Sequence, residues 1–441
     1  MAPKIRRPLK PYQIEDGQHV AKRKATLVAH QPRVGKTNIA IHAADLRLAD
    51  LVIVICPPNV RHNWRQAIKE FRKGRWHAIV CGDNFASKLL PRIKMLRKTR
   101  AFKHVVLVLD ESHRFKNRAA ARTRAVYGPE CTAIGGLVEL ADQVVLLTGT
   151  PLPNDPVELY PMLRSCAPEL IIGDNGRPLS KSRFENRYCK VKWTPFGTKT
   201  VGGKRYGELK ALLMESGFCI RRTRKEVFGR DLQPPTNVYV QAAKAFGSEL
   251  SALEASPEGQ RIKEALQRGG LVALAKLEKG SAARLRKLYG LAKVADLSSL
   301  IADELEEEPD SKVVVGFWHT DVGDAYAQAL RRFHPLVFDG RVSSDRKVRM
   351  NRQFLDNKKH RVILGQIGAA GVGLDFSAAR NVVLAEWSYV GVDNEQFCAR
   401  IFNMNVDEPG FIRFAVLPGS MDAEIAQEAK RKLEIAAKIF D

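Results

Sequence analysis

Short apolar runs alternate with helix-forming segments along the first third of the chain. The runs lie at residues 25–29, 51–56, 78–81, 105–109 and 143–147. They are rich in Val, Ile and Leu without polar alternation, which is typical of strands buried on both faces of a parallel sheet. A helix is expected after the first run, at 38–44, and after the second, at 63–68. This pattern predicts a doubly wound α/β sheet.

A second series of the same kind fills the last third of the chain. Strands are expected at 312–317, 335–338, 362–365 and 382–385, and helices at 325–333 and 421–440. Ser420 is the expected N-cap of the last helix. The pattern at 246–310 is helical and charged. We therefore expect two tandem doubly wound lobes, at 1–235 and 301–441, with a helical linker at 236–300.

A basic stretch interrupts the first lobe at about 180–210. Between Lys181 and Lys210 there are nine Lys and Arg residues against two acids, with Trp193, Phe196 and Tyr206 interspersed. Pro195, Gly197 and the pair Gly202-Gly203 favour hairpins or loops over helix here. The stretch is either an extra nucleic-acid contact or a solvated insertion.

The net charge bounds the class of partner. Lys and Arg total 72 and Asp and Glu total 48, which gives +24 in a chain of 441 residues. An excess of this size favours a polyanion, because each neutralised phosphate releases counterions. The alternative is a basic protein whose charges are simply solvated.

Cysteine usage and hydropathy set the expected compartment. The seven Cys residues are scattered and form no Cys-x-x-Cys pair, so we expect reduced thiols without zinc or disulfides. The basic N-terminus has no apolar core of a signal peptide, and no run of eighteen apolar residues occurs. We expect a cytoplasmic or nuclear-type protein, monomeric, with no membrane partner and no module beyond the two lobes.

A candidate phosphate-binding loop follows the first apolar run. Gly35-Lys36-Thr37 stands between that strand and a helix, as such loops require. Backbone amides and the helix dipole would bind ATP phosphates, Lys36 would reach the β- and γ-phosphates, and Thr37 would hold Mg²⁺. His30 stands where a Gly is usual, and Arg33 stands where a second Gly often lies. A simple turn before a helix is the alternative.

Two further strand ends carry polar residues that suit nucleotide chemistry. Asp110 and Glu111 close the fourth run; one carboxylate can position Mg²⁺ while Glu111 orients and deprotonates the attacking water. An acidic helix start is the alternative. Thr148-Gly149-Thr150 closes the fifth run and is a candidate sensor of the phosphate state. Because ligands bind at the carboxyl ends of parallel strands, we expect these groups in one site.

The second lobe offers a Gly-rich loop and a candidate arginine. Residues 368–375 contain three Gly before Leu374-Asp375, so backbone or phosphate can approach closely there. Gln396 and Arg400 share one helix face at i and i+4. An arginine presented from a mobile lobe can stabilise the transferring phosphoryl group; an ordinary surface arginine is the alternative.

In this order the motifs resemble those of superfamily 2 helicase-like motors, specifically the Swi/Snf-like branch. The resemblance extends over nearly the whole chain and implies two RecA-like lobes. The stretches that carry it are Pro11-Tyr12-Gln13, Gly35-Lys36-Thr37, Cys56-Pro57-Pro58-Asn59, Asp110-Glu111-Ser112-His113, Leu147-Thr148-Gly149-Thr150-Pro151, Ile220-Arg221-Arg222-Thr223-Arg224, Asp339-Gly340, Gly371-Val372-Gly373-Leu374 and Gln396…Arg400.

The resemblance also implies site residues. Catalysis is expected from Lys36, Asp110, Glu111 and Arg400, with Mg²⁺ held at Thr37 and Asp110. Contacts with ATP are expected at Tyr12, Gln13, Arg33, Gly35, Lys36, Thr37, Gly373 and Gln396. Contacts with nucleic acid are expected at Pro58, Asn59, Asn63, Trp64, His113 and Lys116, and in the basic stretch at Lys204 and Arg205.

A finer resemblance connects the chain to annealing-helicase (HARP-like) proteins, which rewind or branch-migrate DNA. It rests on Leu288-Tyr289-Gly290-Leu291-Ala292-Lys293, Phe317-Trp318-His319-Thr320 and Ala385-Glu386-Trp387. Stand-alone members of this kind also occur in phages and bacteria, which suggests such an origin.

One departure from the family pattern concerns the last motif. A second arginine is usual three residues after Arg400, and it commonly contacts the γ-phosphate; this chain has Asn403. Loss of such a group can cost orders of magnitude in turnover. We expect slow hydrolysis, reliance on Arg400 alone, or an arginine from elsewhere, and we expect Asn403→Arg to raise the rate.

Three functions follow from these observations. The leading one is a DNA-dependent ATPase that translocates on or remodels duplex or branched DNA, by branch migration, annealing or fork remodelling. The second is a DNA-binding protein switched by ATP with little hydrolysis, which Asn403 favours. The third is an RNA helicase, which the Asp-Glu-Ser-His and Asn63-Trp64 signatures speak against.

Overall fold

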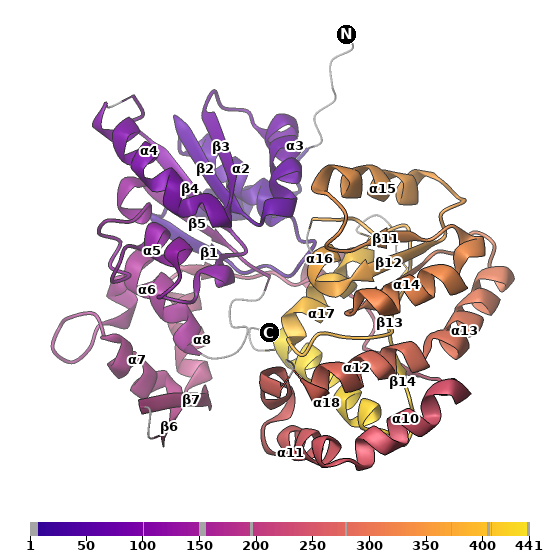
Figure 1. The fold of residues 1–441 in the computed structure, drawn as a ribbon. Coiled ribbons are helices and arrows are strands. Elements are labelled where there is room, and N and C mark those ends of the chain that lie inside the picture. Colours follow the sequence, from indigo (N-terminus) through magenta and orange to yellow (C-terminus); the bar gives the residue numbers. More distant parts are fainter. Residues whose placement is uncertain are drawn as a thin grey trace, which may run out of the picture. The chain divides into compact units, whose positions relative to one another are not determined.

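The chain forms two compact units, each with its own parallel sheet (Figure 1). A computed structural model describes residues 8–99, 101–149, 156–194, 197–277, 280–371, 373–403, 406 and 408–438. The first unit runs to Val227 and the second from Phe228 to Lys438. The division therefore falls before the boundary expected near residue 235. Two doubly wound parallel-sheet lobes confirm the predicted fold class.

The first sheet contains six parallel strands in the order β3-β2-β4-β5-β1-β8. Every residue of β2 is buried, as its unbroken run of apolar side chains predicts. Strand β1, which precedes the candidate phosphate loop, lies between β5 and β8, and β5 also pairs with β4. The ends of β1, β5 and β4, which carry the candidate site residues, are therefore neighbours. The strands are β1 (Ala25–Val28), β2 (Leu51–Cys56), β3 (His77–Gly82), β4 (Val105–Asp110), β5 (Gln143–Leu147) and β8 (Cys219–Ile220).

Two groups of helices cover this sheet (Figure 1). One group, α1 to α3, and another, α4 to α6, each pack among themselves. Helix α3 buries Trp64 and Ile68 and exposes Arg65 and Lys69. The helices are α1 (Pro11–Ala21), α2 (Lys36–Leu46), α3 (Arg61–Phe71), α4 (Ala86–Lys98), α5 (Ala121–Tyr127) and α6 (Tyr160–Cys166).

The basic stretch forms a helix, a hairpin and a second helix. Strands β6 (Cys189–Thr194) and β7 (Gly197–Gly203) pair antiparallel, as the Gly and Pro residues predicted. Helices α7 (Lys181–Tyr188) and α8 (Tyr206–Glu215) flank them, where the sequence suggested loops. Phe184 and Tyr188 on α7 are buried in the core of the first unit. The side chains of Trp193 and Phe196 lie outside the described residues.

The second sheet also has six parallel strands, in the order β11-β12-β10-β13-β14-β9. Strand β14 includes Arg413, whose ion pair with Glu304 lets a charged residue sit in a strand. Strand β9 lies at the edge, within the segment expected to be a linker. The strands are β9 (Thr236–Tyr239), β10 (Val313–Phe317), β11 (Leu336–Phe338), β12 (Val362–Gln366), β13 (Asn381–Leu384) and β14 (Phe411–Val416).

The helices expected to form a separate linker belong to the second unit. Leu253, Leu274, Leu285 and Leu297 from four successive helices share one hydrophobic core with the sheet. We therefore correct the expected linker at 236–300 to part of the second lobe. These helices are α10 (Lys244–Ala255), α11 (Pro257–Leu277), α12 (Ser281–Ala292) and α13 (Val294–Glu307).

The remaining helices follow the strands of the second sheet. Helix α18 begins at Met421, and the Oγ of Ser420 accepts a hydrogen bond from the amide of Asp422. The helices are α14 (Thr320–Ala329), α15 (Ser344–Asp356), α16 (Ile367–Ala370), α17 (Gly391–Cys398), the short 3-10 helix η8 (Ala399–Ile401) and α18 (Met421–Lys438). Among the described residues, no helix has the length and apolar character needed to cross a membrane.

Candidate nucleotide site

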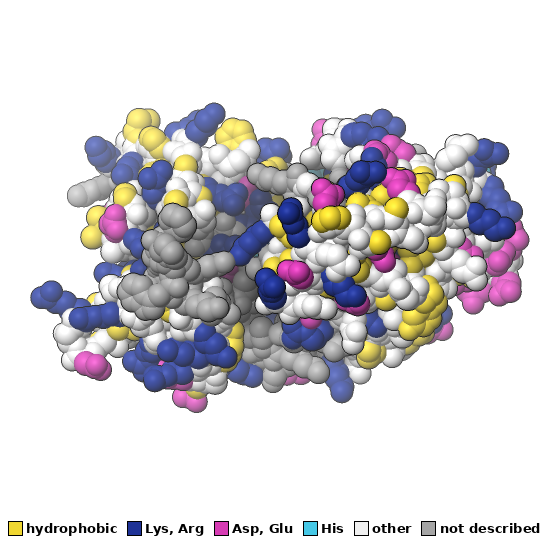
Figure 2. All heavy atoms as spheres, turned by 60° about the horizontal axis from the view of Figure 1, so that its bottom comes forward, with side chains coloured by type: hydrophobic (Ala, Val, Ile, Leu, Met, Phe, Trp, Pro, Cys, Tyr) yellow, Lys and Arg dark blue, Asp and Glu magenta, His cyan; other side chains and the backbone are white. Residues whose placement is uncertain are grey.

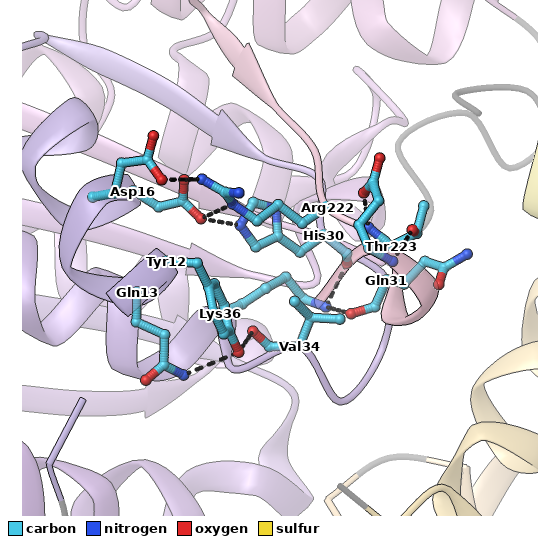
Figure 3. A network of polar contacts seen from close by, with 11 residues as sticks. Tyr12, Gln13, Asp16, His30, Gln31, Val34, Lys36, Arg222 and Thr223 are labelled. Atoms are coloured by element: carbon cyan, nitrogen blue, oxygen red, sulfur yellow. Dashed lines mark hydrogen bonds and ion pairs between the residues drawn. The ribbon is translucent and has the colours of Figure 1, made fainter. Parts of the chain in front are cut away.

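The candidate phosphate loop folds back on its own lysine (Figure 3). The Nζ of Lys36 donates to the carbonyl oxygens of His30 at 2.8 Å and Gln31 at 3.2 Å. Lys36 is the first residue of α2, so its charge lies at the positive end of a helix dipole. The loop that is expected to bind phosphate thus binds the ammonium group of its own lysine through two carbonyl oxygens. Phosphate oxygens can replace these carbonyl oxygens as acceptors for Lys36.

Two residues of the loop, Arg33 and Gly35, have left-handed backbone. Gly35 has φ +77°, which glycine adopts without strain, whereas Arg33 has φ +75°. A side chain in this conformation costs roughly 1–2 kcal/mol. Strain at a non-glycine residue is common in ligand-binding loops, and it occurs here at the position where the sequence lacks the usual Gly.

Helix α1 touches the far end of the loop. The hydroxyl of Tyr12 donates to the carbonyl oxygen of Val34 at 3.1 Å, and Gln13 Nε2 donates to that hydroxyl at 3.4 Å. A Cβ placed on Gly35 would lie 2.2 Å from Gln13 Nε2, so a side chain at this position would displace the Gln13 amide. Burial raises the pKa of Tyr12 to about 12, which keeps its hydroxyl protonated as a donor.

His30 fixes the other end of the loop to the same helix. Its ring is fully buried, and its Nε2 lies 2.9 Å from Oδ2 of Asp16. Burial lowers the pKa of His30, so the ring is neutral, and Nε2 carries the proton because a carboxylate only accepts. Asp16 also accepts two hydrogen bonds from Arg222, both at 2.8 Å. Burial opposes ionisation, but the hydrogen bonds from His30 and Arg222 hold the pKa of Asp16 below its usual range.

The segment after β8 holds the outer side of the loop. Arg221 donates to the carbonyl of Ala29 at 2.9 Å, and Arg224 donates to that of Pro32 at 3.3 Å. The amide of Arg224 donates to Oε1 of Gln31 at 2.8 Å. Together with Lys36 and Tyr12, these donors satisfy the loop carbonyls at 29 to 32 and 34. The sequence marked this segment by family resemblance only, and a role in holding the loop was not foreseen.

Asp110 ends β4 with a half-buried carboxylate. Burial and the adjacent Glu111 raise its pKa to about 6, while Trp64 and the charge of Lys36 lower it. Lys36 follows β1 and Asp110 ends β4, and both strands pair with β5, so the two residues lie at the same edge of the sheet. Glu111 has φ +51°, a strained conformation that re-aims its side chain directly after the strand. The hydroxyl of Thr37 and the carboxylate of Asp110 are the hard oxygen ligands that Mg²⁺ prefers, so the donor set fits this ion.

The structure corrects the role expected of Trp64. Its side chain is 2% exposed, and its indole Nε1 donates to Oδ2 of Asp110 at 2.7 Å. A buried indole that is bonded inside the site cannot contact nucleic acid. Trp64 instead orients the candidate metal ligand.

His113 connects two strand ends. Its Nδ1 lies 3.1 Å from Oγ1 of Thr148, which follows β5, and 3.4 Å from Oε2 of Glu111. Burial lowers its pKa to about 3, so the ring is neutral. A Cβ on Gly149 would lie 3.1 Å from Pro32, so this glycine lets the β5 end approach the phosphate loop. Thr150 and Pro151 lie outside the described residues.

The other residues expected to contact nucleic acid are spread over the first unit. Pro58 and Asn59 lie in a 3-10 turn after β2, and Asn63 lies in the first turn of α3. Lys116 pairs with Glu158 at 2.7 Å. Lys204 and Arg205 are exposed at the end of the hairpin. Lys204 and Arg205 are therefore accessible to nucleic acid, but their exposure alone does not show that they bind it.

In the second unit, Arg400 holds the Gly-rich loop. Its Nε donates to the carbonyl of Gly371 at 2.9 Å and its Nη1 to that of Leu374 at 3.4 Å. Gly373 has φ +82°, as a tight turn requires, and Gln396 is buried. Asn403 Nδ2 donates to the carbonyl of Ser377 at 3.3 Å. Val372 lies outside the described residues.

Close packing explains several residues in the stretches that resemble annealing-helicase proteins. Gly290 on α12 has no room for a side chain, since a Cβ would lie 2.9 Å from the carboxyl carbon of Glu386. Glu386 accepts hydrogen bonds from the amides of Trp318 and His319. Lys293, which directly follows α12, is buried and pairs with Asp422. These stretches therefore fasten α12 to the strand ends of the second sheet.

A lysine loop, a half-buried carboxylate pair and a strand-end threonine on adjacent parallel strands define a P-loop nucleotide-binding protein. Comparison with known proteins adds a match to a family model. Residues 87–245 match the family model described as SNF2-related domain. The match covers about a third of the chain and agrees with the resemblance of its motifs to the Swi/Snf-like branch.

Curated relatives support the same relationship. A Xenopus tropicalis protein, "SWI/SNF-related matrix-associated actin-dependent regulator of chromatin subfamily A-like protein 1", is 29% identical over 86% of this chain. The Bos taurus "DNA annealing helicase and endonuclease ZRANB3" is 24% identical over 99% of this chain. The chain spans only 39% and 41% of the lengths of these two relatives. Both are animal proteins, so they do not support the expected phage or bacterial origin.

A solved structure is also among the similar proteins that were found. It is the "Sulfolobus solfataricus SWI2/SNF2 ATPase core in complex with dsDNA". The TM-score is 0.42 with 17% sequence identity, and the match covers 99% of this chain and 94% of that one.

Proposed function

We propose that the protein is a DNA-dependent ATPase that translocates on or remodels duplex or branched DNA. One geometric observation carries the ATPase part: Lys36 follows β1 and Asp110 ends β4, and both strands pair with β5 in the parallel sheet. That arrangement brings a phosphate-binding cation and a candidate Mg²⁺ ligand to the same edge of the sheet. ATP and Mg²⁺ are the cofactors that these groups fit.

Each group has a defined task in this proposal. Lys36 leaves the carbonyls of His30 and Gln31 and binds the β- and γ-phosphates. Asp110, oriented by Trp64, would hold Mg²⁺ together with Thr37, and the bound ion would supply positive charge that neutralises the phosphates. Glu111 accepts the proton of the attacking water. His113 and Thr148 report the state of this site to the end of β5.

The DNA part of the proposal rests on charge and on the relatives. The net charge is +24, and Figure 2 shows Lys and Arg side chains gathered on the insertion of the first unit, at the lower left of the view. Within the described residues, Arg183, Lys190 and Lys204 of this insertion have no ion pair. The names of the relatives refer to chromatin and to DNA annealing, and we extend the DNA substrate to this chain.

The test is steady-state ATP turnover on a panel of nucleic acids. The arms are no nucleic acid, single-stranded DNA, duplex DNA, a four-way junction and RNA, with Lys36→Ala as the blank. We expect DNA, and most of all duplex or branched DNA, to raise turnover well above the blank, with stimulation that falls steeply as salt rises. Equal turnover in all arms would contradict DNA dependence, and stimulation by RNA alone would favour the RNA helicase.

A second candidate is an ATP-switched DNA-binding protein with little hydrolysis. Asn403 favours it, and so does Arg400, whose guanidinium donates to carbonyls of the Gly-rich loop of the same unit. In that case ATP and a non-hydrolysable analogue would change DNA affinity equally, while turnover stayed at the level of the Lys36→Ala blank.

A further inference from the structure

Two side chains on one face of α1 hold the candidate phosphate loop near its two ends (Figure 3). Tyr12 and Asp16 lie one helical turn apart, so they project from the same side of the helix. The hydroxyl of Tyr12 donates to the carbonyl oxygen of Val34 at 3.1 Å, and Oδ2 of Asp16 lies 2.9 Å from Nε2 of His30. All four residues belong to the first unit, so their arrangement is a property of one compact body.

His30 connects Asp16 to the lysine of the loop. Its carbonyl oxygen accepts a hydrogen bond from Nζ of Lys36 at 2.8 Å, while its fully buried ring donates to Asp16. Nδ1 of this ring is buried and has no hydrogen-bond partner among the described residues. Within that part of the chain, the bond to Asp16 is therefore the polar contact that orients the ring. The same bond steadies the backbone that Lys36 leaves when it moves to a phosphate.

Arg222 compensates the charge that Asp16 brings into the interior. The side chain of Asp16 is only 6% exposed, and a buried carboxylate is costly without a cationic partner. Arg222 donates to both of its oxygens at 2.8 Å. Glu15 accepts from the same guanidinium at 2.7 Å, but its side chain is 72% exposed. Of these two acids, Asp16 is the one bonded to a residue of the loop.

The shape of the loop determines how well it binds phosphate. The amides that follow His30, together with the start of α2, are the groups expected to bind the anion. A loop that already has its binding shape loses less conformational freedom when the ligand binds. Truncating Asp16 or His30 would break the connection between α1 and the first residue of the loop. The nucleotide would then have to order this segment, and part of the binding energy would be lost.

We propose that Asp16 and Arg222 are positioning residues for nucleotide binding, which act through His30 on the phosphate loop. This rests on the proposed function, because it concerns how that same site binds ATP. Arg222 holds the carboxylate of Asp16, Asp16 holds the ring of His30, and the backbone of His30 fixes the start of the loop. The side chain of His30 is thus an anchor at a position where phosphate loops usually have glycine.

The experiment compares Asp16→Ala with Glu15→Ala, which removes the adjacent acid that pairs with the same arginine. Affinities for ADP and AMP are measured by competition with a fluorescent ATP analogue. We expect Asp16→Ala to raise the Kd for ADP about tenfold to 100-fold, the scale of losing a hydrogen bond to a charged group. The Kd for AMP, which has no β-phosphate for the loop to bind, should change by about threefold or less. Glu15→Ala should change both values by about threefold or less, since it breaks only an exposed ion pair.

A conservative substitution of His30 tests the same connection from the side of the loop. The amide nitrogen of a glutamine can donate to Asp16 as Nε2 of histidine does, whereas alanine cannot. We expect His30→Gln to bind ADP at least about fivefold more tightly than His30→Ala. The double variant Asp16→Ala/His30→Ala should bind ADP within about threefold of the weaker single variant, because both substitutions break one connection.

The outcomes separate this inference from the proposed function. Equal ADP affinity in Asp16→Ala and Glu15→Ala overturns the inference, and so does an equal loss of ADP and AMP affinity in Asp16→Ala. Thermal unfolding and duplex-DNA affinity without nucleotide show whether each variant is folded. If Asp16→Ala does not fold, the comparison of His30→Gln with His30→Ala decides, and equal ADP affinities in that pair overturn the inference. Wild-type protein that binds neither ATP nor ADP would overturn the proposed function itself, and this inference with it.

Discussion

The phosphate loop of the first unit and the Gly-rich loop of the second are both held by a cation on backbone carbonyls. In the first unit the cation is Lys36, which belongs to the loop and begins a helix. In the second it is Arg400, which comes from η8 and contacts carbonyls 29 and 26 residues earlier. Lys36 can therefore move to a phosphate while the loop keeps its outer donors, whereas Arg400 joins two segments that depend on it.

This difference shows that a motif position does not fix the role of a cation. The sequence assigned both residues to catalysis. The contacts of Lys36 suit an exchangeable binding group, and those of Arg400 suit a positioning residue. Substitutions separate the two roles when effects on turnover are compared with effects on stability.

The largest effect is expected for Lys36→Ala. Removing the charge that binds the β- and γ-phosphates should lower DNA-stimulated turnover about 1,000-fold or more, the scale seen when a charge-stabilising group is removed. Because its present partners are exchangeable carbonyls, the thermal unfolding temperature without nucleotide should hardly change. Turnover and thermal melts check both parts. A large loss of stability would mean that Lys36 holds the loop as Arg400 does.

For Arg400→Ala we expect a larger effect on stability than on turnover. It removes two charge-assisted hydrogen bonds from backbone carbonyls of the Gly-rich loop, which should cost about 1–3 kcal/mol in the free energy of unfolding. Denaturant unfolding measures this cost. Arg400→Lys should recover only part of it, because a lysine cannot reproduce the fork of a guanidinium. Unchanged stability together with a large loss of kcat would instead restore the catalytic role.

The strand ends of the first unit should give it a distinctive pH dependence. The folded pKa of His113 is about 3 against 6.5 for the free side chain. The unfolded chain therefore takes up a proton first, and stability falls as pH drops from about 6.5, by up to about 1.4 kcal/mol per pH unit. Asp110, whose folded pKa is raised from 3.8 to about 6, gives the opposite slope between those values.

His113→Gln should remove only the first of these contributions. Urea unfolding at intervals between about pH 5 and 7.5, a range that spans the pKa of free histidine, measures the difference in slope between variant and wild type. We expect the wild type to lose more stability than the variant below about pH 6.5. Parallel curves would show that His113 is not held neutral in the folded protein.

The smallest effect is expected at the insertion. Lys204→Ala with Arg205→Ala should weaken stimulation by duplex DNA several-fold and leave turnover without DNA unchanged. The slope of log affinity against log salt should become shallower by up to about two, because each substitution removes one cation that can neutralise a phosphate. Identical salt dependence in the double variant would remove the insertion from the DNA surface.

The fold was predictable where the pattern was local and unbroken. Strands β2 and β4 are continuous apolar runs, and both were found with their bounds nearly correct. Strand β14 was missed because Arg413 interrupts its apolar pattern, and only the distant Glu304 makes that arginine acceptable. Strand β9 was missed because it is short and only partly buried at a sheet edge.

The site residues, like the strands, were predictable where their sequence signature is local. Lys36, Asp110 and Glu111 stand in local strand–loop signatures that the sequence displays directly. Trp64 was misassigned because its partner, Asp110, lies 46 residues away, and Arg222 was given no role because Asp16 lies 206 residues away. Long-range hydrogen bonds leave no periodicity in the sequence, so only the folded chain reveals them.

The most direct test of the central claim is ATP-driven displacement of a third strand from a triplex at the end of a linear duplex. The account predicts displacement by the wild-type protein with ATP and Mg²⁺, and none by Lys36→Ala or with a non-hydrolysable analogue. Displacement that is equal with and without ATP, or absent while duplex DNA still stimulates hydrolysis, would contradict a motor that moves along DNA.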